Sequence, residues 1–261
     1  MSESVENKNH SVSISKFYEG KSIFITGAAG FVGVVLLEIL LRCCGGIKSI
    51  YILLREKKGV SPQARKEEIF KRSVLVYTST AYSNCNRKLK IEERVYRLPY
   101  EAQRFIDAVD SGKEELLQQI ASECQPRWPN HYSFSKCIAE NLLIEKASDI
   151  PTAIIRPSLI GPIWKGALPG YVEENSSLAQ LLIAISKGFL KVLPAHPKVC
   201  LDFIPADIVA NAHVIAACRL ATQSDPSPFV VNCSSHGSYE YRIDEQIHVV
   251  TEVSMKKYDS S

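Results

Sequence analysis

The sequence predicts an α/β fold in which parallel strands alternate with helices, wound on both sides of one sheet. Residues 22–26 form a short apolar run of strand type, glycines follow at positions 27, 30 and 33, and residues 34–41 form an amphipathic apolar segment. Strand, glycine turn and helix in this order are typical of the first unit of a dinucleotide-binding Rossmann sheet. Further strand-length runs at 48–54, 72–80, 152–155 and 229–234 are separated by segments with helical periodicity.

The three glycines of the first turn each have a physical role in such a unit. Gly27 allows the tight turn, Gly30 lets the backbone approach a pyrophosphate, and Gly33 lets the helix pack closely on the strand. The helix N-terminus adds free N–H groups and partial positive charge. A purely structural turn is the alternative, but the spacing and both flanks favour a nucleotide site.

Composition and charge exclude several other classes of protein. The chain has 261 residues, a net charge of +3 and no basic run interleaved with aromatic residues, so we expect no nucleic-acid partner. Its eight cysteines form neither a C-x-x-C pair nor a cluster with histidine, which predicts reduced thiols in an intracellular protein and no metal site. The apolar runs are shorter than the ~20 residues that span a bilayer, and residues 1–16 are polar, as expected of a disordered lead-in without a secretory signal.

Arg55 stands where the second strand, 48–54, is predicted to end. An acidic residue here would bind a ribose hydroxyl, whereas arginine accommodates the 2′-phosphate of NADP. A solvated surface arginine is the alternative. Beyond it we predict a polar helix at 61–71, helical segments on both sides of residues 111–112, a helix at 131–147 with Asn130 as N-cap, and a helix from Asp207 to about Leu220.

Tyr132 and Lys136 are four residues apart on one predicted helix and therefore share a face. A tyrosine needs a nearby cation to act as an acid or base near neutral pH, because its ordinary pKa is about 10. The pair alone is expected about once by chance in this composition, but a strand ending in hydroxyls precedes it. Thr80 would bind a substrate carbonyl oxygen, Tyr132 would donate the proton, and Lys136 would stabilise the tyrosinate and hold a ribose. We interpret His131, His213 and Cys137 as packing or surface residues.

These motifs together resemble the extended short-chain dehydrogenase/reductases, and more narrowly the animal fatty acyl-CoA reductases. The resemblance covers most of residues 17–236 and depends on these segments: FYEGKSIFITGAAGFVGVVLLEILLR, IKSIYILLREKKG, VYTSTAYSN, PNHYSFSKCIAENLL, IIRPSLIGPIWKGALPGYVEENSS and LDFIPADIVANAHVIAA.

The resemblance implies a reductase domain at 17–236, whose substrate-binding part is at 162–236, followed by an unassigned tail at 237–261. It implies catalytic roles for Thr80, Tyr132 and Lys136. It also implies that a loop beginning at Pro157 faces the nicotinamide and that residues 164–177 cover an acyl entrance. The residues implied to hold the adenosine phosphates of NADPH are Thr26, Gly27, Ala29, Gly30, Phe31, Val32, Gly33 and Arg55.

Members of this family reduce a long-chain acyl-CoA, with two NADPH and through an aldehyde, to a primary alcohol. They are associated with peroxisomal or endoplasmic-reticulum membranes through a C-terminal region, and the resemblance does not extend to such a region here. Two strand–helix units of the family also have no counterpart between Lys71 and Arg72. We expect the remaining strands either to close up or to leave unpaired edges.

Three functions therefore remain open: an NADPH-dependent fatty acyl-CoA reductase, an inactive splice product or gene-model fragment of one, and an extended reductase or epimerase acting on another substrate, such as a nucleotide sugar. NADPH turnover with palmitoyl-CoA distinguishes the first from the other two.

Overall fold

A computed structural model describes most of the chain. The described residues are 13–28, 30–53, 74–88, 90–124, 127–148, 150–166, 168–174, 176–190, 192, 196, 198–222, 228–235, 241–245, 248 and 252. Ala29, Arg55, the predicted helix at 61–71, most of the predicted lead-in and most of the tail therefore lie outside the described residues.

The N-terminal part forms a small parallel β-unit. Its elements are α1 (Ile14–Tyr18), β1 (Ser22–Thr26), α2 (Phe31–Cys43) and β2 (Ser49–Leu53), and β1 pairs in parallel with β2. Alternate side chains of a strand point to opposite faces, and here Ile25 is buried in a core with α2. Phe24 and Tyr51, which face each other in the register, remain more than half exposed.

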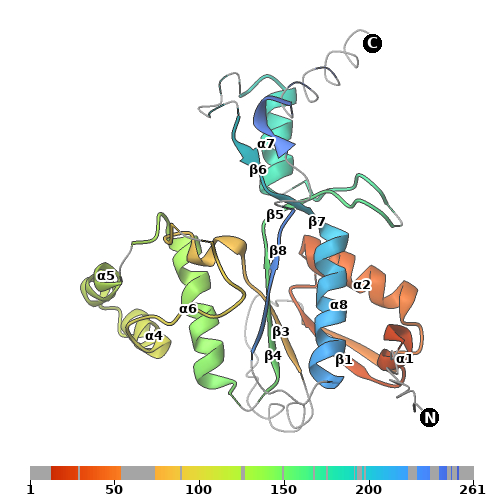
Figure 1. Cartoon of the computed structure of the whole chain (residues 1–261), viewed down its shortest axis with the longest axis horizontal. Helices are drawn as coiled ribbons and strands as arrows, with labels where there is room; N and C mark the ends of the chain where they lie inside the picture. Colours follow the sequence, from red (N-terminus) through yellow and green to blue (C-terminus); the bar gives the residue numbers. More distant parts are fainter. Residues whose placement is uncertain are drawn as a thin grey trace, which may run out of the picture.

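A second sheet lies at the centre of the molecule and has the strand order β3-β4-β8, all parallel (Figure 1). Its strands are β3 (Leu75–Thr78), β4 (Thr152–Pro157) and β8 (Phe229–Cys233). The middle strand, β4, is buried along its whole length, as expected for a parallel strand covered on both faces. Helix α6 (His131–Lys146) covers one face and α8 (Ala206–Thr222) the other.

The described strands do not form the single sheet that the sequence predicted. The α/β class with parallel strands is confirmed, but β1 and β3 belong to different sheets. The described strands have therefore not closed up into one sheet; the two sheets are instead held side by side by α8. Its residues Ala210 and Val214 pack in the core of the first sheet, and Val209 and Leu220 pack in the core of the second.

The connections beyond the central strands carry the remaining elements. The 3-10 helix η2 (Ala81–Asn84) follows β3, and the predicted helical segments on both sides of residues 111–112 form α4 (Ala102–Asp110) and α5 (Glu114–Glu123). Beyond the ends of β4 and β8, β5 (Leu159–Gly161) pairs in parallel with β7 (Phe203–Pro205).

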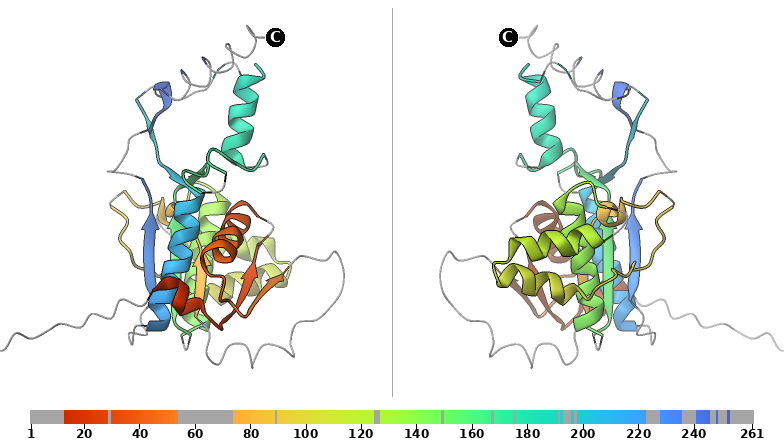
Figure 2. Two further views of the ribbon diagram at one scale, coloured as in Figure 1. Left: turned by 90° about the vertical axis from the view of Figure 1, so that its right-hand side faces the viewer. Right: turned by 90° about the vertical axis from the view of Figure 1, so that its left-hand side faces the viewer.

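The last elements lie at the far end of the molecule from α1. Figure 2 shows α7 (Ser177–Ser186) projecting there. At the same end of the molecule β6 (Cys200–Leu201) pairs antiparallel with β9 (Tyr241–Arg242). Strand β9 lies in the tail to which the sequence assigned no structure. Within the described part of the chain, every helix is too short or too polar to traverse a bilayer.

Candidate active site

The glycine turn has the geometry that the sequence predicted for a phosphate-binding loop. Gly27 has a φ of 68°, in the left-handed region, and its carbonyl accepts a hydrogen bond of 2.9 Å from the Gly30 N–H. A Cβ atom on Gly33 would lie 2.2 Å from the Gly27 carbonyl oxygen, so only glycine permits this approach of α2 to the loop. Gly30 is the N-cap of α2 and has no side chain to occupy the first N–H groups, which are therefore available to an anion.

The other residues predicted for the nucleotide lie around this turn. Thr26 is exposed at the end of β1. The rings of Phe31 and Tyr171 pack edge to face, with their centroids 6.1 Å apart. Val32 packs against the core of the central sheet. The N-terminus of α2 is thereby turned toward the part of the molecule that carries the predicted catalytic residues.

Thr80 directly follows β3 and is buried, with 4% of its surface exposed. Its Oγ1 accepts a hydrogen bond of 3.3 Å from the Tyr82 N–H, which caps η2, and it lies 3.5 Å from the Pro157 carbonyl oxygen. Two residues from the sequence prediction, Thr80 and Pro157, are therefore brought together at the C-terminal ends of β3 and β4. In open α/β sheets this is the edge at which ligands bind.

Helix α6 supplies the other two predicted catalytic residues. Its N-cap is Asn130, whose side chain accepts a hydrogen bond of 2.8 Å from the Ser133 N–H, as predicted. The Lys136 Nζ donates to the Thr78 carbonyl oxygen at 3.0 Å and lies 5.3 Å from the centre of the Tyr77 ring. Tyr132, one turn earlier, is 56% exposed and thus accessible to a substrate.

The electrostatics around Lys136 reflect its half-buried position. Burial lowers the pKa of Lys136 below its ordinary value, and the Glu140 carboxylate partly opposes this shift. Burial raises the pKa of Tyr77 to about 12, to which the charges of Glu140 and Tyr132 add. Tyr77 therefore stays neutral beside Lys136, and the ammonium group is the cation available to a tyrosinate or a ribose.

A buried ion pair next to the site was not foreseen from the sequence. Glu140 and Arg156 have side chains with 0% exposure, and an Arg156 Nη atom lies 2.6 Å from a Glu140 oxygen. Ser79, which precedes Thr80, donates to the same carboxylate at 2.5 Å. The sequence carried two signals, the spacing of Glu140 four residues after Lys136 and the charge of Arg156 in an apolar run, and neither identifies the partner.

On the substrate side, Asp207 fixes the start of the segment predicted to cover an acyl entrance. Its two carboxylate oxygens accept the N–H groups of Trp164 and Lys165 at 2.9 and 3.1 Å. Asp207 lies in the first turn of α8, the helix that the sequence predicted to begin there, and its carboxylate also binds the loop that follows β5. The side chains of Trp164, Leu168 and Tyr171 are each at least 41% exposed.

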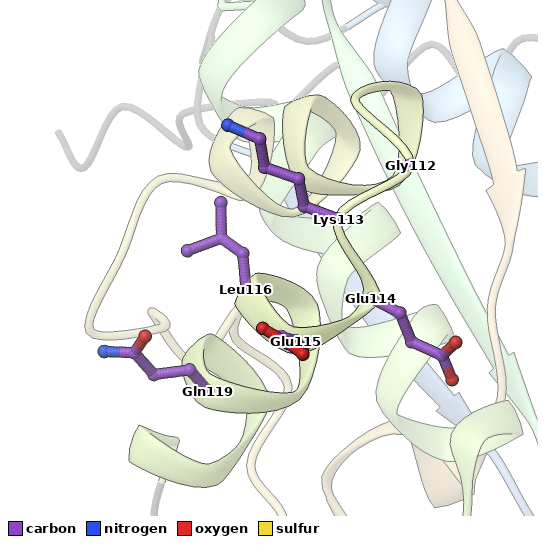
Figure 3. Close-up of a pocket in the computed structure, with 6 residues that line it drawn as sticks. All are labelled: Gly112, Lys113, Glu114, Glu115, Leu116 and Gln119. Carbon is purple, nitrogen blue, oxygen red and sulfur yellow. The ribbon is translucent and has the colours of Figure 1, made fainter.

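A separate hollow of about 550 Å³ lies at the turn between α4 and α5 (Figure 3). It is lined by Gly112, Lys113, Glu114, Glu115, Leu116 and Gln119. None of these is a predicted site residue, and all but Leu116 are exposed. This hollow is therefore distinct from the candidate active site.

Comparison with known proteins identifies relatives over most of the chain. An NAD-binding family model described as male sterility protein matches residues 25–74 and 67–213. Fatty acyl-CoA reductase 1 of Gallus gallus is 29% identical over 324 residues, covering 92% of this chain and 63% of that protein, and the Homo sapiens protein of the same name is 27% identical with the same coverage. The chain thus spans 63% of the length of these relatives.

Solved structures with the same fold are more distant in sequence. The reductase domain of a nonribosomal peptide synthetase from Mycobacterium tuberculosis is 15% identical with a TM-score of 0.58, covering 90% of this chain and 72% of that one. An ADP-L-glycero-D-manno-heptose-6-epimerase from Helicobacter pylori is 16% identical with a TM-score of 0.54, covering 90% and 83%. At these identities the similarity concerns the fold alone.

The alignment with the Gallus gallus protein also locates missing sequence. Its 324 positions exceed the roughly 240 residues that 92% of this 261-residue chain supplies, so the relative has on the order of 80 residues that this chain lacks. The two segments matched by the family model meet at residues 67–74, where the sequence predicted the loss of two strand–helix units. The separation of β1 from β3 agrees with this loss.

Proposed function

The chain belongs to the male sterility protein family of NAD-binding domains, and from this premise we propose that it derives from an NADPH-dependent enzyme that reduces long-chain acyl-CoA to a primary alcohol through an aldehyde. The observation that carries the proposal is the placement of Thr80 and Lys136 at one edge of the central sheet, with Lys136 bonded to the Thr78 carbonyl.

The residues of the glycine turn fit a dinucleotide. Gly33 lies so close to the Gly27 carbonyl that there is no room for a side chain at position 33. The N-cap of α2 has no side chain that binds the first N–H groups of the helix, which suits a pyrophosphate. Gly27, Gly30, Phe31, Val32 and Gly33 would hold the phosphates, together with Thr26 and Ala29. The choice of NADPH over NADH depends on Arg55.

In the proposed reaction, bound NADPH supplies the hydride for each of two reductions. The hydroxyl groups of Thr80 and Tyr132 bind the carbonyl oxygen of the substrate, and Tyr132 donates a proton to it as negative charge develops. Lys136, as a cation, stabilises the resulting tyrosinate and binds a ribose hydroxyl. Cleavage of the C–S bond after the first reduction releases coenzyme A as the thiol and leaves the aldehyde.

The proposed substrate and location follow from the same relatives. The curated relatives are named for acyl-CoA reduction, and the exposed apolar side chains of Trp164, Leu168 and Tyr171 suit an acyl chain next to the nicotinamide loop at Pro157. Association with a peroxisomal or endoplasmic-reticulum membrane is part of the proposal for the parent enzyme.

A second candidate function, nucleotide binding without turnover, is favoured by one observation. In the described part of the chain β1 and β3 belong to separate sheets, so the proposed phosphate loop follows a strand of one sheet and Thr80 follows a strand of the other. Such a chain would retain the pyrophosphate site and lose part of the surface under the cofactor. Reduction or epimerisation of a nucleotide sugar is the third candidate, and only the similarity of fold to an epimerase supports it.

The decisive experiment follows NADPH oxidation by the chain with palmitoyl-CoA and identifies the product. Tyr132→Phe is expected to lower the rate at least 10²-fold. Tyr51→Phe is the matched control, because Tyr51 is 58% exposed against 56% for Tyr132 but lies on β2. A wild-type chain that binds NADPH without oxidising it supports the second candidate. Turnover with a nucleotide sugar and none with palmitoyl-CoA supports the third.

A further inference from the structure

The buried ion pair between Glu140 and Arg156 joins three elements at the candidate active site. Arg156 donates from Nε and Nη to the two oxygens of Glu140 at 2.9 and 2.6 Å, a bidentate arrangement between β4 and α6. The hydroxyl of Ser79, the residue after β3, donates a further bond to the Glu140 carboxylate. The two remaining bonds of Arg156 go to the carbonyl oxygens of Glu92 and Arg94 at 3.2 and 2.9 Å, so its guanidinium is well satisfied.

The residues held by this pair are the chain neighbours of the proposed catalytic groups. Ser79 precedes Thr80, and Arg156 precedes Pro157. Glu140 lies one helical turn after Lys136 on the same face of α6. A single carboxylate therefore fixes the position of α6 against β3 at the level where Lys136 meets the Thr78 carbonyl.

We propose that Glu140 is the positioning residue for Lys136: clamped by Arg156 and Ser79, its carboxylate holds α6 in register with β3 and keeps Lys136 there as a cation. The inference rests on the proposed function for its catalytic meaning, since Lys136 is the proposed partner of Tyr132. It concerns a residue that makes no contact with the reacting atoms.

The physical case rests on what a buried ion pair does. Its desolvation cost offsets most of its attraction, so its main effect is on geometry rather than net stability. The charge of Glu140 in this pair also affects the protonation of Lys136. The charge that acts on Lys136 is that of Glu140, one turn later on α6; Tyr132 lies one turn earlier on the same helix, and the Tyr77 ring on β3 has its centre 5.3 Å from the Lys136 Nζ. Losing the charge of Glu140 removes the influence that opposes the effect of burial on the pKa of Lys136.

The test measures the titration of Lys136 in the full chain with and without Glu140. Lysines are labelled by reductive ¹³C-methylation, and the Lys136 signal is assigned with Lys136→Arg. In Glu140→Gln the midpoint for Lys136 is expected to fall below that of the wild type, because the carboxylate that favours the ammonium form is lost. Glu145→Gln is the matched control, because Glu145 is on the same helix and its carboxylate accepts the Ala102 N–H instead. It is expected to leave the Lys136 midpoint unchanged.

A second variant covers the case in which Glu140→Gln does not fold, since an unpaired Arg156 is costly. Glu140→Leu with Arg156→Met removes both charges together, and the Lys136 midpoint is again expected to fall, because the Glu140 carboxylate is the charge that opposes the effect of burial. A midpoint that matches the Glu145→Gln control in either folded variant overturns the inference.

The result for Lys136 is independent of turnover. If the wild-type chain oxidises NADPH, the alkaline limb of its rate profile is expected to move to lower pH in Glu140→Gln with the Lys136 midpoint. If the wild-type chain shows no turnover, the proposed function fails for this chain, while the lysine titration still decides the role of Glu140.

Discussion

Replacing Gly33 with alanine tests the close approach that defines the phosphate loop. In an ordinary helix interior this change stabilises by about 1 kcal/mol, because alanine has the higher helix propensity. Here the new Cβ would lie 2.2 Å from the Gly27 carbonyl oxygen and 2.7 Å from the Ala28 Cα. Both are backbone atoms that no rotamer change can move, so we expect overpacking to cost roughly 1–3 kcal/mol beyond the propensity gain. The sign of the change therefore distinguishes the two effects.

The assay is urea unfolding, accompanied by titration with NADPH followed by nucleotide fluorescence. Gly33→Ala is expected to lower the unfolding midpoint and to abolish nucleotide binding, because the loop must shift to accommodate the methyl group. Gly45→Ala, at the other end of α2, is the control, since a Cβ there meets no atom within 4 Å. A Gly33→Ala chain that is as stable as the wild type or more so, and equally able to bind NADPH, would refute the reasoning.

Three further predictions concern single side chains. Burial lowers the pKa of His213 below its ordinary 6.5, so the unfolded chain binds the proton more readily than the folded chain. The stability that is present above about pH 6.5 is therefore lost as the pH falls. Measuring the unfolding midpoint against pH should show this loss in the wild type and in the control His196→Gln, and a smaller loss in His213→Gln. Burial raises the pKa of Cys137 to about 12, so iodoacetamide at pH 7.5 should spare it while modifying the exposed Cys85, as peptide mass spectrometry would show. Asn130→Ala removes the cap of α6 and should cost about 1 kcal/mol in urea unfolding, whereas no loss would contradict the capping bond.

The sequence predicted those parts of the fold that depend on local chemistry. The glycine spacing located β1, the turn and α2, because Gly27 adopts a φ of 68° and a Cβ on Gly33 would lie 2.2 Å from the Gly27 carbonyl oxygen. The cap at Asn130 located the start of α6, and the break at residues 111–112 separated α4 from α5, where Gly112 adopts a φ of 66°. Thr80 and Pro157 were predicted separately and meet because parallel strands end at the same edge.

What the sequence did not predict depends on contacts between distant segments. Among the described strands β1 and β3 do not pair, and the local sequence of a strand does not determine which other strand lies next to it. The bonds between Ser79, Glu140 and Arg156 join residues as far as 61 positions apart. Arg156 is the fifth of the six residues of β4 and follows two isoleucines, so its charge indicates a buried partner without identifying it.

Helix α8 has a consequence for how the molecule comes apart. It has one apolar side in each core, and the Val214 carbonyl on it also accepts the Tyr18 hydroxyl at 2.8 Å. In the described part of the chain the two sheets share no backbone hydrogen bonds and are joined largely through the packing of α8. The β1–α2–β2 unit can therefore unfold locally while the central sheet stays folded. We expect hydrogen exchange to show two cooperative units of different stability. A dinucleotide that contacts both units would stabilise the β1–α2–β2 unit against local unfolding. We therefore expect its binding to slow hydrogen exchange in β1 and β2.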